Sequence, residues 1–169
     1  TQYLKRGDAI VFGQACGEPA SLVAALKEQG AAIGDLKAFI ATSFSGAFTP
    51  DSAGAFRLSS MGAIGALRSM SKVNALDVIP VHVSQVGPLI TAGIIPCDVA
   101  MIQVSPPDAE GRYSCGLIGD YVRAAVDKAR VVIAEVNANV PYVHGEYLTA
   151  DDIDVLHETD APVVEVAAA

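Results

Sequence analysis

Two apolar runs constrain the fold of this chain more than any other feature. They read VAMIQV at residues 99–104 and VVIAEV at residues 131–136, and both are rich in Val and Ile. Runs without regular polar alternation are typical of strands that are buried on both faces, and such strands belong mostly to parallel sheets. Between the runs lie a polar loop, a short strand and an amphipathic helix at residues 120–129. The sequence therefore predicts parallel strands joined by a helical crossover.

The same alternation of strands and helices covers the rest of the chain. We expect strands at residues 9–13, 36–41 and 78–83. Helices are expected from Pro19 to Gly30, at the end of residues 62–72, and at residues 85–92 with a break near Pro88. The predicted fold class is α/β: one domain over residues 1–169, a three-layer sandwich around a mostly parallel sheet, with right-handed crossovers.

The two ends of the chain suggest a piece of a longer protein. The opening TQYLKRGD has no start Met and reads as the tail of a helix that stops at Gly7, and the closing APVVEVAAA is strand-like. We therefore expect a fragment rather than the alternative, a processed or tagged natural domain.

Composition favours a water-soluble protein of the cytoplasm, with neither nucleic acid nor a membrane as partner. The net charge is −8, the cationic residues are scattered and there is no Trp, so neither a basic patch nor a base-stacking surface is expected. No apolar run approaches the roughly 20 residues that span a bilayer. The three cysteines form no CxxC pair, which argues against a structural zinc site and fits a reducing compartment. We expect no metal and no bound cofactor.

A glycine turn, GQACG, follows the first predicted strand and precedes a helix. Gly13 and Gly17 can let backbone N–H groups approach an anion, with help from the helix dipole. Their spacing is neither the dinucleotide fingerprint nor a Walker loop, and no Lys follows. Taken alone, a tight turn that needs glycine for steric reasons is the better explanation.

Cys16 lies in this turn and raises a second possibility, a cysteine hydrolase. A thiol near a helix N-terminus can have a lowered pKa, and His82 or His144 would serve as its base. A small packed cysteine is the better explanation of this residue.

Other polar residues also follow predicted strands. Ser84 comes after the third strand, Ser105 opens the loop SPPD, and Glu135 and Asn137 lie at the end of VVIAEVN. A glutamate inside a buried strand is costly unless it is paired, so we interpret Glu135 as hydrogen-bonded scaffold. The carboxyl ends of parallel strands are where ligands bind in open α/β sheets, so this edge is the predicted site.

Five stretches together carry a family resemblance. They are KRGD at residues 5–8, GQACGEP at 13–19, DVIPVHVSQVGPLI at 77–90, DVAMIQVSPPDAEGRYSCG at 98–116 and VVIAEVNANVPYVHGE at 131–146. With them the chain resembles the N-terminal half of the acetyl-CoA hydrolase/transferase family, one of the class I CoA-transferases. The resemblance covers nearly the whole chain and is weakest over residues 48–61.

The resemblance implies a fold like that of ribose-5-phosphate isomerase and an enzyme of two similar halves with the active site between them. In the family a glutamate attacks the acyl-CoA thioester, and a glutamyl-CoA thioester then passes CoA to a carboxylate or to water. That glutamate lies in the C-terminal half, so no catalytic residue is expected here. The implied partners are acyl-CoA, a small carboxylate or water, the C-terminal half and further copies in a homo-oligomer.

The N-terminal half is expected to supply one wall of the acyl pocket. In the family a loop like Thr42-Ser43 faces the substrate carboxylate. The substrate-binding residues inferred from the strand ends and from the resemblance are Gly13, Gln14, Gly17, Thr42, Ser43, Ser84, Ser105, Asn137 and His144.

Two other function classes stay open at this point. A Rossmann-like nucleotide-binding module needs a phosphate fingerprint and an acidic residue after the second strand, where Thr42 and Ser43 stand instead. A non-catalytic half that only supports a partner is the other. The parent sequence beyond residue 169 would discriminate them, because the enzyme class requires a second α/β half with a glutamate before a glycine-rich loop.

Overall fold

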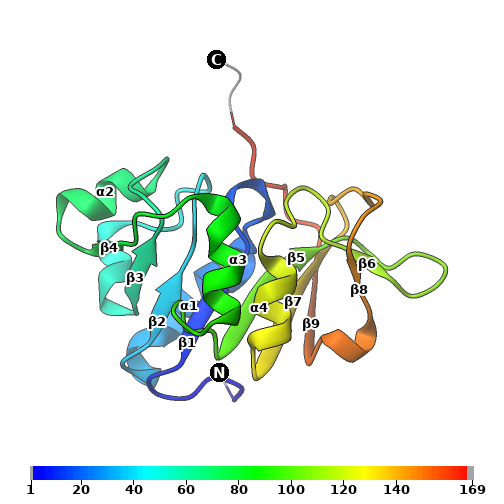
Figure 1. The fold of residues 1–169 in the computed structure, drawn as a ribbon, viewed down its shortest axis with the longest axis horizontal. Coiled ribbons are helices and arrows are strands. Elements are labelled where there is room, and N and C mark those ends of the chain that lie inside the picture. Colours follow the sequence, from blue (N-terminus) through cyan, green and yellow to red (C-terminus); the bar gives the residue numbers. More distant parts are fainter. Residues whose placement is uncertain (1, 167–169) are drawn as a thin grey trace.

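A single seven-stranded parallel sheet forms the centre of the molecule. The structure is a computed structural model that describes residues 2–166. The strand order is β4-β3-β2-β1-β5-β7-β9, and every pair of neighbours is parallel (Figure 1). The strands are β1 (Ala9–Phe12), β2 (Lys37–Phe39), β3 (Arg57–Ser60), β4 (Leu76–Val78), β5 (Val99–Val104), β7 (Val131–Asn137) and β9 (Val155–Thr159).

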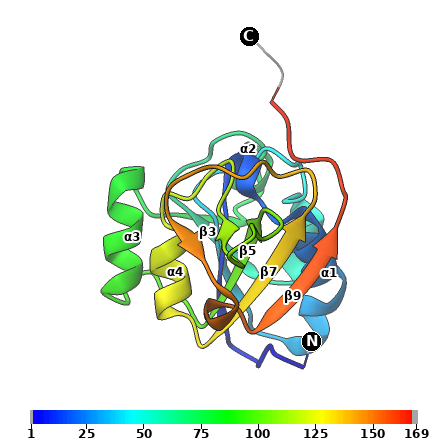
Figure 2. The same ribbon diagram turned by 90° about the vertical axis from the view of Figure 1, so that its right-hand side faces the viewer.

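Helices cover both faces of the sheet. Figure 2 shows α1 (Ala20–Ile33) on one side, and α3 (Val83–Thr91) with α4 (Val122–Lys128) on the other. The short α2 (Leu67–Lys72) lies beside β3 and β4. This confirms the predicted three-layer α/β sandwich. A two-stranded antiparallel sheet of β6 (Tyr113–Ser114) and β8 (Tyr147–Leu148) lies near α4 and β7. Residues 2–166 also contain three 3-10 helices: η1 (Ala15–Gly17), η2 (Pro50–Gly54) and η3 (Ala150–Asp152).

The core consists of two apolar layers, one on each face of the sheet. Val11 and Ile102 pack with α3 and α4, whereas Ile10, Phe12 and Met101 pack with α1. Successive residues of one strand therefore enter different layers, because side chains alternate across a strand. All six residues of β5 and all seven of β7 are buried, which confirms that these strands are covered on both faces.

The segment from residue 76 to residue 92 differs from the prediction. The strand there is β4, which ends at Val78, and Val83 already begins α3. His82 caps the helix, since its Nδ1 accepts the Ser84 N–H at 3.3 Å. α3 continues through Pro88 to Thr91, so the predicted break is absent, and the burial of Val86 and Ile90 in the core offsets the hydrogen bond that Pro88 cannot donate.

Gly30 does not end α1. The helix continues to Ile33 and stops at Gly34, whose φ of +85° is a conformation that glycine adopts readily. Gly30 instead allows a close approach, because a Cβ atom there would lie 2.8 Å from the carbonyl oxygen of Ala55.

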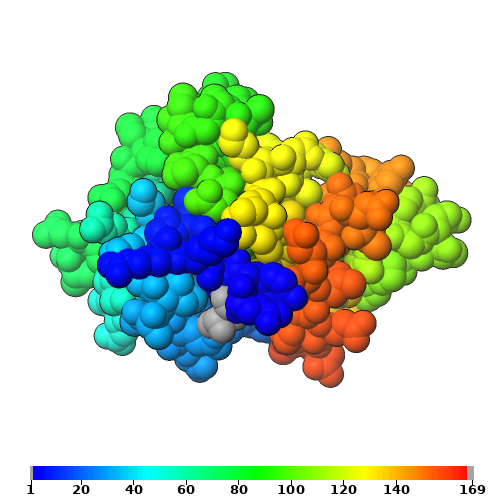
Figure 3. All heavy atoms as spheres, turned by 90° about the horizontal axis from the view of Figure 1, so that it is seen from below, coloured from blue at the N-terminus to red at the C-terminus, as the bar shows by residue number. Residues whose placement is uncertain are grey.

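The helix tail predicted at the N-terminal end and the strand predicted at the C-terminal end are both wrong where the structure describes these residues. Residues 2–8 form turns rather than a helix, held in part by the Lys5 N–H, which donates to Asp8 Oδ2 at 2.7 Å. Figure 3 shows this segment (dark blue) on the lower surface of the molecule, the side on which the strands begin in Figure 1. At the other end residues 160–166 form no strand, and residues 167–169 lie outside the described part. The last strand is β9, which the sequence analysis did not predict.

Candidate functional site

The direction of strand addition reverses between β1 and β5. From β1 the sheet grows through β2, β3 and β4 on one side and through β5, β7 and β9 on the other. The loops that leave the carboxyl ends of β1 and β5 therefore diverge, and ligands of open α/β sheets bind in the crevice at such a point. Residues 13–18, which follow β1, lie at this place at the top of Figure 1.

The turn at residues 13–17 is sterically tight. A Cβ atom at Gly13 would lie 2.6 Å from the carbonyl oxygen of Gly17, and one at Gly17 would lie 3.2 Å from that of Ile118. Ala15 has a φ of +53°, and its N–H donates to the Thr42 carbonyl at 2.8 Å. The packing alone thus accounts for both glycines, and the hydrogen bond joins this turn to the loop after β2.

A chain of buried amides connects the turn to the other half of the sheet. Gln103 Nε2 donates to the Cys16 carbonyl at 3.3 Å, and Asn137 Nδ2 donates to Gln103 Oε1 at 3.0 Å and to the Ala161 carbonyl at 3.1 Å. Gln14, 6% exposed, donates from Nε2 to Asp120 Oδ2. The carboxyl ends of β1, β7 and β9 are therefore linked by hydrogen bonds that pass through the Gln103 side chain of β5.

Glu18 ends the turn and is completely buried. Its Oε2 accepts from Ser43 Oγ at 2.8 Å, and its Oε1 accepts from Ser45 Oγ. Burial raises the pKa of the Glu18 carboxyl, although the two serine hydrogen bonds act in the opposite direction. The sequence analysis gave Glu18 no structural role. The sequence did contain a signal for such a role, because a glutamate in a tight turn, directly before the Pro19 that precedes a helix, is placed where it can be buried.

Glu135 is the second buried carboxylate near this edge. Its Oε2 accepts the backbone N–H groups of Ser21 and Leu22, at 3.0 and 3.2 Å, in the first turn of α1. Burial raises its pKa, and these backbone donors oppose that rise. The interpretation of Glu135 as hydrogen-bonded scaffold is confirmed.

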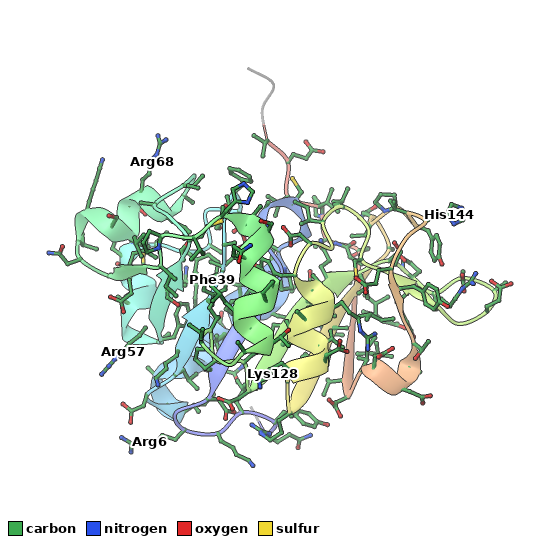
Figure 4. The ribbon with its side chains drawn as sticks, in the orientation of Figure 1. Arg6, Phe39, Arg57, Arg68, Lys128 and His144 are labelled. Atoms are coloured by element: carbon green, nitrogen blue, oxygen red, sulfur yellow. The ribbon has the colours of Figure 1, made fainter. Side chains whose placement is uncertain are left out.

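The nine predicted site residues fall into three groups. The residues in the loops after β1 and β2 are joined by the bonds described above, and Asn137 is joined to them through Gln103. Ser105 is buried in the β5–β6 connection, where Oγ donates to the Pro106 carbonyl at 2.8 Å and accepts the Ser114 N–H at 3.1 Å. Ser84 and His144 are exposed, and Figure 4 shows His144 pointing outward near the β6–β8 sheet.

The cysteine-hydrolase arrangement is not formed in the described residues. Cys16 is half-buried and its thiol hydrogen-bonds to no histidine there, while His82 Nδ1 is 2.9 Å from Ser84 Oγ. Within residues 2–166 no three His, Cys, Asp or Glu side chains are grouped so as to hold a metal ion. None of the helices in these residues has the length and apolarity that crossing a bilayer requires.

An open groove of about 410 Å³ lies at the same edge, next to the amide chain. It runs along the ends of β7 and β9 and under the loop after β5. Its lining is part apolar and part acidic and consists of Pro106, Pro107, Val136, Ala138, Glu158, Thr159 and Asp160.

Comparisons with known proteins identify relatives over nearly the whole chain. The model for the acetyl-CoA hydrolase/transferase N-terminal domain matches residues 1–167. The 4-hydroxybutyrate coenzyme A transferase of Clostridium kluyveri is 34% identical over 160 residues, which are 93% of this chain and 37% of that protein. The succinyl-CoA:cyclohexane-1-carboxylate CoA transferase of Geobacter metallireducens is 27% identical over 168 residues, 96% of this chain and 38% of its own.

Solved structures agree in fold. The 4-hydroxybutyrate CoA-transferase of Porphyromonas gingivalis is 29% identical with a TM-score of 0.75, over 98% of this chain and 38% of that one. RipA of Yersinia pestis, at 24% identity, has a TM-score of 0.90 over 98% of this chain and 42% of its own. The chain therefore spans about two fifths of the length of the relatives that it matches.

Proposed function

Since this chain belongs to the acetyl-CoA hydrolase/transferase family, as its N-terminal domain, we propose that the protein containing it moves CoA between short-chain carboxylic acids. The observation that carries the proposal is the family match over residues 1–167, together with relatives that are CoA transferases over more than nine tenths of this chain. Acyl-CoA thioesters are the proposed substrates, and a small carboxylate or water is the proposed acceptor.

The part assigned to this domain is one wall of the acyl pocket. The loops after β1 and β2 lie at the reversal point of the sheet and are joined by the Ala15–Thr42 and Glu18–Ser43 hydrogen bonds. A rigid wall is what such a reaction requires, because the acceptor carboxylate must be held close to the reacting carbonyl. The residues proposed to form this wall are Gly13, Gln14, Gly17, Thr42, Ser43, Ser105 and Asn137, all buried within the domain, with the exposed Ser84 and His144 at its margins.

The buried carboxylates of the domain do not suit the role of nucleophile. Glu18 has no exposed surface and holds two serine hydroxyls, and Glu135 is 1% exposed and binds the start of α1. We propose that a glutamate in the C-terminal half attacks the thioester and displaces CoA thiolate. The thiolate then attacks the mixed anhydride and releases the first acid, which leaves a glutamyl-CoA thioester for the acceptor.

The test uses the full-length parent protein with acetyl-, propionyl-, butyryl- and succinyl-CoA, each with and without acetate. CoA exchange that depends on acetate supports a transferase, and thiol release without acetate supports a hydrolase. The absence of both activities across the whole panel would contradict the proposal. The purified 169-residue chain should be inactive, because the proposed nucleophile belongs to the C-terminal half.

A control addresses the cysteine-hydrolase alternative. Turnover by the isolated chain that disappears in the Cys16→Ala variant would favour that alternative, because Cys16 is the one partly exposed cysteine in the described residues. Tight binding of a mononucleotide by the same isolated chain would instead favour a nucleotide-binding module.

A further inference from the structure

Glu18 holds two serines of one loop at the same time. Ser43 donates to Oε2 and Ser45 donates to Oε1, so each carboxylate oxygen accepts a hydrogen bond from one serine hydroxyl. The residue between them, Phe44, is 38% exposed. Anchoring the residues on either side of Phe44 to a buried group leaves its ring on the surface of the carboxyl edge. The conformation of this loop is thus fixed from beneath by a residue of the neighbouring loop.

Ser43 also binds a third segment of the chain, at Gly65 and Ala66. Its carbonyl accepts the Ala66 N–H at 3.0 Å, and it forms an isolated parallel bridge with Gly65. The approach is so close that a Cβ atom at Gly65 would lie 2.4 Å from the Ser43 carbonyl oxygen and 3.0 Å from the Phe44 ring. Displacing Ser43 would therefore disturb the segment that leads into α2 and the exposed ring together.

The chemistry of the contact favours a positioning role over a role in stability alone. A buried carboxylate is expensive, and no Lys or Arg forms an ion pair with Glu18 in the described residues. What a carboxylate adds over an apolar side chain is two acceptors at a fixed separation. These acceptors set where both serines lie relative to the turn after β1.

We propose that Glu18 is a positioning residue that sets the spacing between the loop at residues 13–18 and the loop at residues 42–45, and thereby the shape of the acceptor side of the site. This assignment rests on the proposed CoA-transferase function. Glu18 does not touch substrate in this scheme, because both of its carboxylate oxygens already accept hydrogen bonds from serine hydroxyls. It acts through Ser43, Ser45 and the ring of Phe44.

The experiment compares Glu18→Gln with Glu135→Gln in the full-length protein. Both replace a buried carboxylate by an amide of the same shape, but Glu135 holds backbone N–H groups of α1 and not the serine loop. For Glu18→Gln we expect the KM for the carboxylate acceptor to rise about 10-fold, because small misplacements of binding groups cost this much or more. The KM for acyl-CoA should change less than 2-fold or so. Glu135→Gln should leave both constants close to those of the unmodified protein.

A second variant and a second readout keep the test decisive. Ser45→Ala removes one anchor and keeps the other, so it should change the acceptor KM in the same direction by a smaller factor. Hydrogen exchange of residues 42–47 should become faster in Glu18→Gln and stay unchanged in Glu135→Gln. Acceptor constants in Glu18→Gln that equal those of Glu135→Gln would overturn the assignment.

Failure of the proposed function gives a different result. If the unmodified protein transfers no CoA, the CoA-transferase proposal fails. The hydrogen-exchange measurement alone then decides the role of Glu18. Faster exchange confined to residues 42–47 in Glu18→Gln would then uphold the spacing role. Equal exchange in the two variants would overturn it.

Discussion

The hydroxyl group of Tyr121 donates to the carbonyl oxygen of Phe12 at 2.7 Å, where β1 ends. The same hydroxyl accepts the N–H of Ala41 at 3.2 Å, just beyond β2. A side chain from the start of α4 thus lies between two neighbouring strands where their mutual hydrogen bonding stops. The loops at residues 13–18 and 42–45 diverge directly beyond this point, so Tyr121 fixes the base of the candidate site.

Tyr121→Phe should destabilise the protein by about 1–3 kcal/mol, because it leaves a buried carbonyl and a buried N–H without a partner. The ring itself should keep its edge-on contact with Phe39, at a centroid distance of 6.0 Å. Denaturant unfolding measures the change. Tyr113→Phe is the matched control, since the Tyr113 hydroxyl has no hydrogen-bond partner in the described residues. An equal effect in the two variants would contradict the role given to the Tyr121 hydroxyl.

Gly13→Ala should be destabilising by about 1–3 kcal/mol, the usual cost of overpacking. The new methyl group would lie 2.6 Å from the Gly17 carbonyl oxygen, and backbone would have to move to admit it. Gly54→Ala is the control, because a Cβ atom at Gly54 meets nothing within 4 Å. Thermal unfolding of both variants checks the prediction, which fails if Gly13→Ala is as stable as Gly54→Ala.

The three cysteines should differ sharply in reactivity. Burial raises the pKa of Cys97 to about 12 and that of Cys115 to about 11, so both stay protonated and covered near neutral pH. Cys16 is partly exposed. A colorimetric disulfide reagent should therefore label one thiol of this domain quickly, and Cys16→Ser should remove that fast phase. Fast labelling that persists in Cys16→Ser would show that the turn or the core opens readily.

Sequence patterns were sufficient for the long central strands β5 and β7 and insufficient for β3 and β9, which lie farther from the centre of the sheet. β5 was predicted with its observed bounds and β7 to within one residue, because their runs are long and apolar. β3, with the sequence RLSS, and β9, with VLHET, were missed. β9 is an edge strand that is half-buried at most, so its polar residues hide the pattern.

The candidate site shows the same division. That Thr42 and Ser43 follow a strand at the carboxyl edge was predictable from the local pattern. That Ser43 donates to Glu18, and Gln14 to Asp120, was not, because these pairs are separated by 25 and 106 residues along the chain. The expectation that Ser43 donates to a substrate carboxylate stays a prediction. In the structure its single proton is directed at Glu18.

The stability of the protein should carry a pH signature of Glu18. Burial raises the pKa of this carboxyl, so the folded state holds the proton more tightly than the unfolded state does. The resulting stabilisation is fully present below the usual pKa of a glutamate and is lost as the pH rises through the raised value. Glu18→Gln has no such loss. The unfolding free energy of Glu18→Gln minus that of the unmodified protein should therefore increase with pH across this window.

Denaturant unfolding at a series of pH values measures this difference. Glu28→Gln, at an exposed position of α1, is the control for the loss of one negative charge. Glu135→Gln should show a trend of the same sign as Glu18→Gln, because burial raises the pKa of Glu135 as well. A difference that stays flat with pH for Glu18→Gln, or that falls as the pH rises, would mean that the two serine hydrogen bonds outweigh the cost of burial. Glu18 would then stabilise the folded protein most strongly in its charged form.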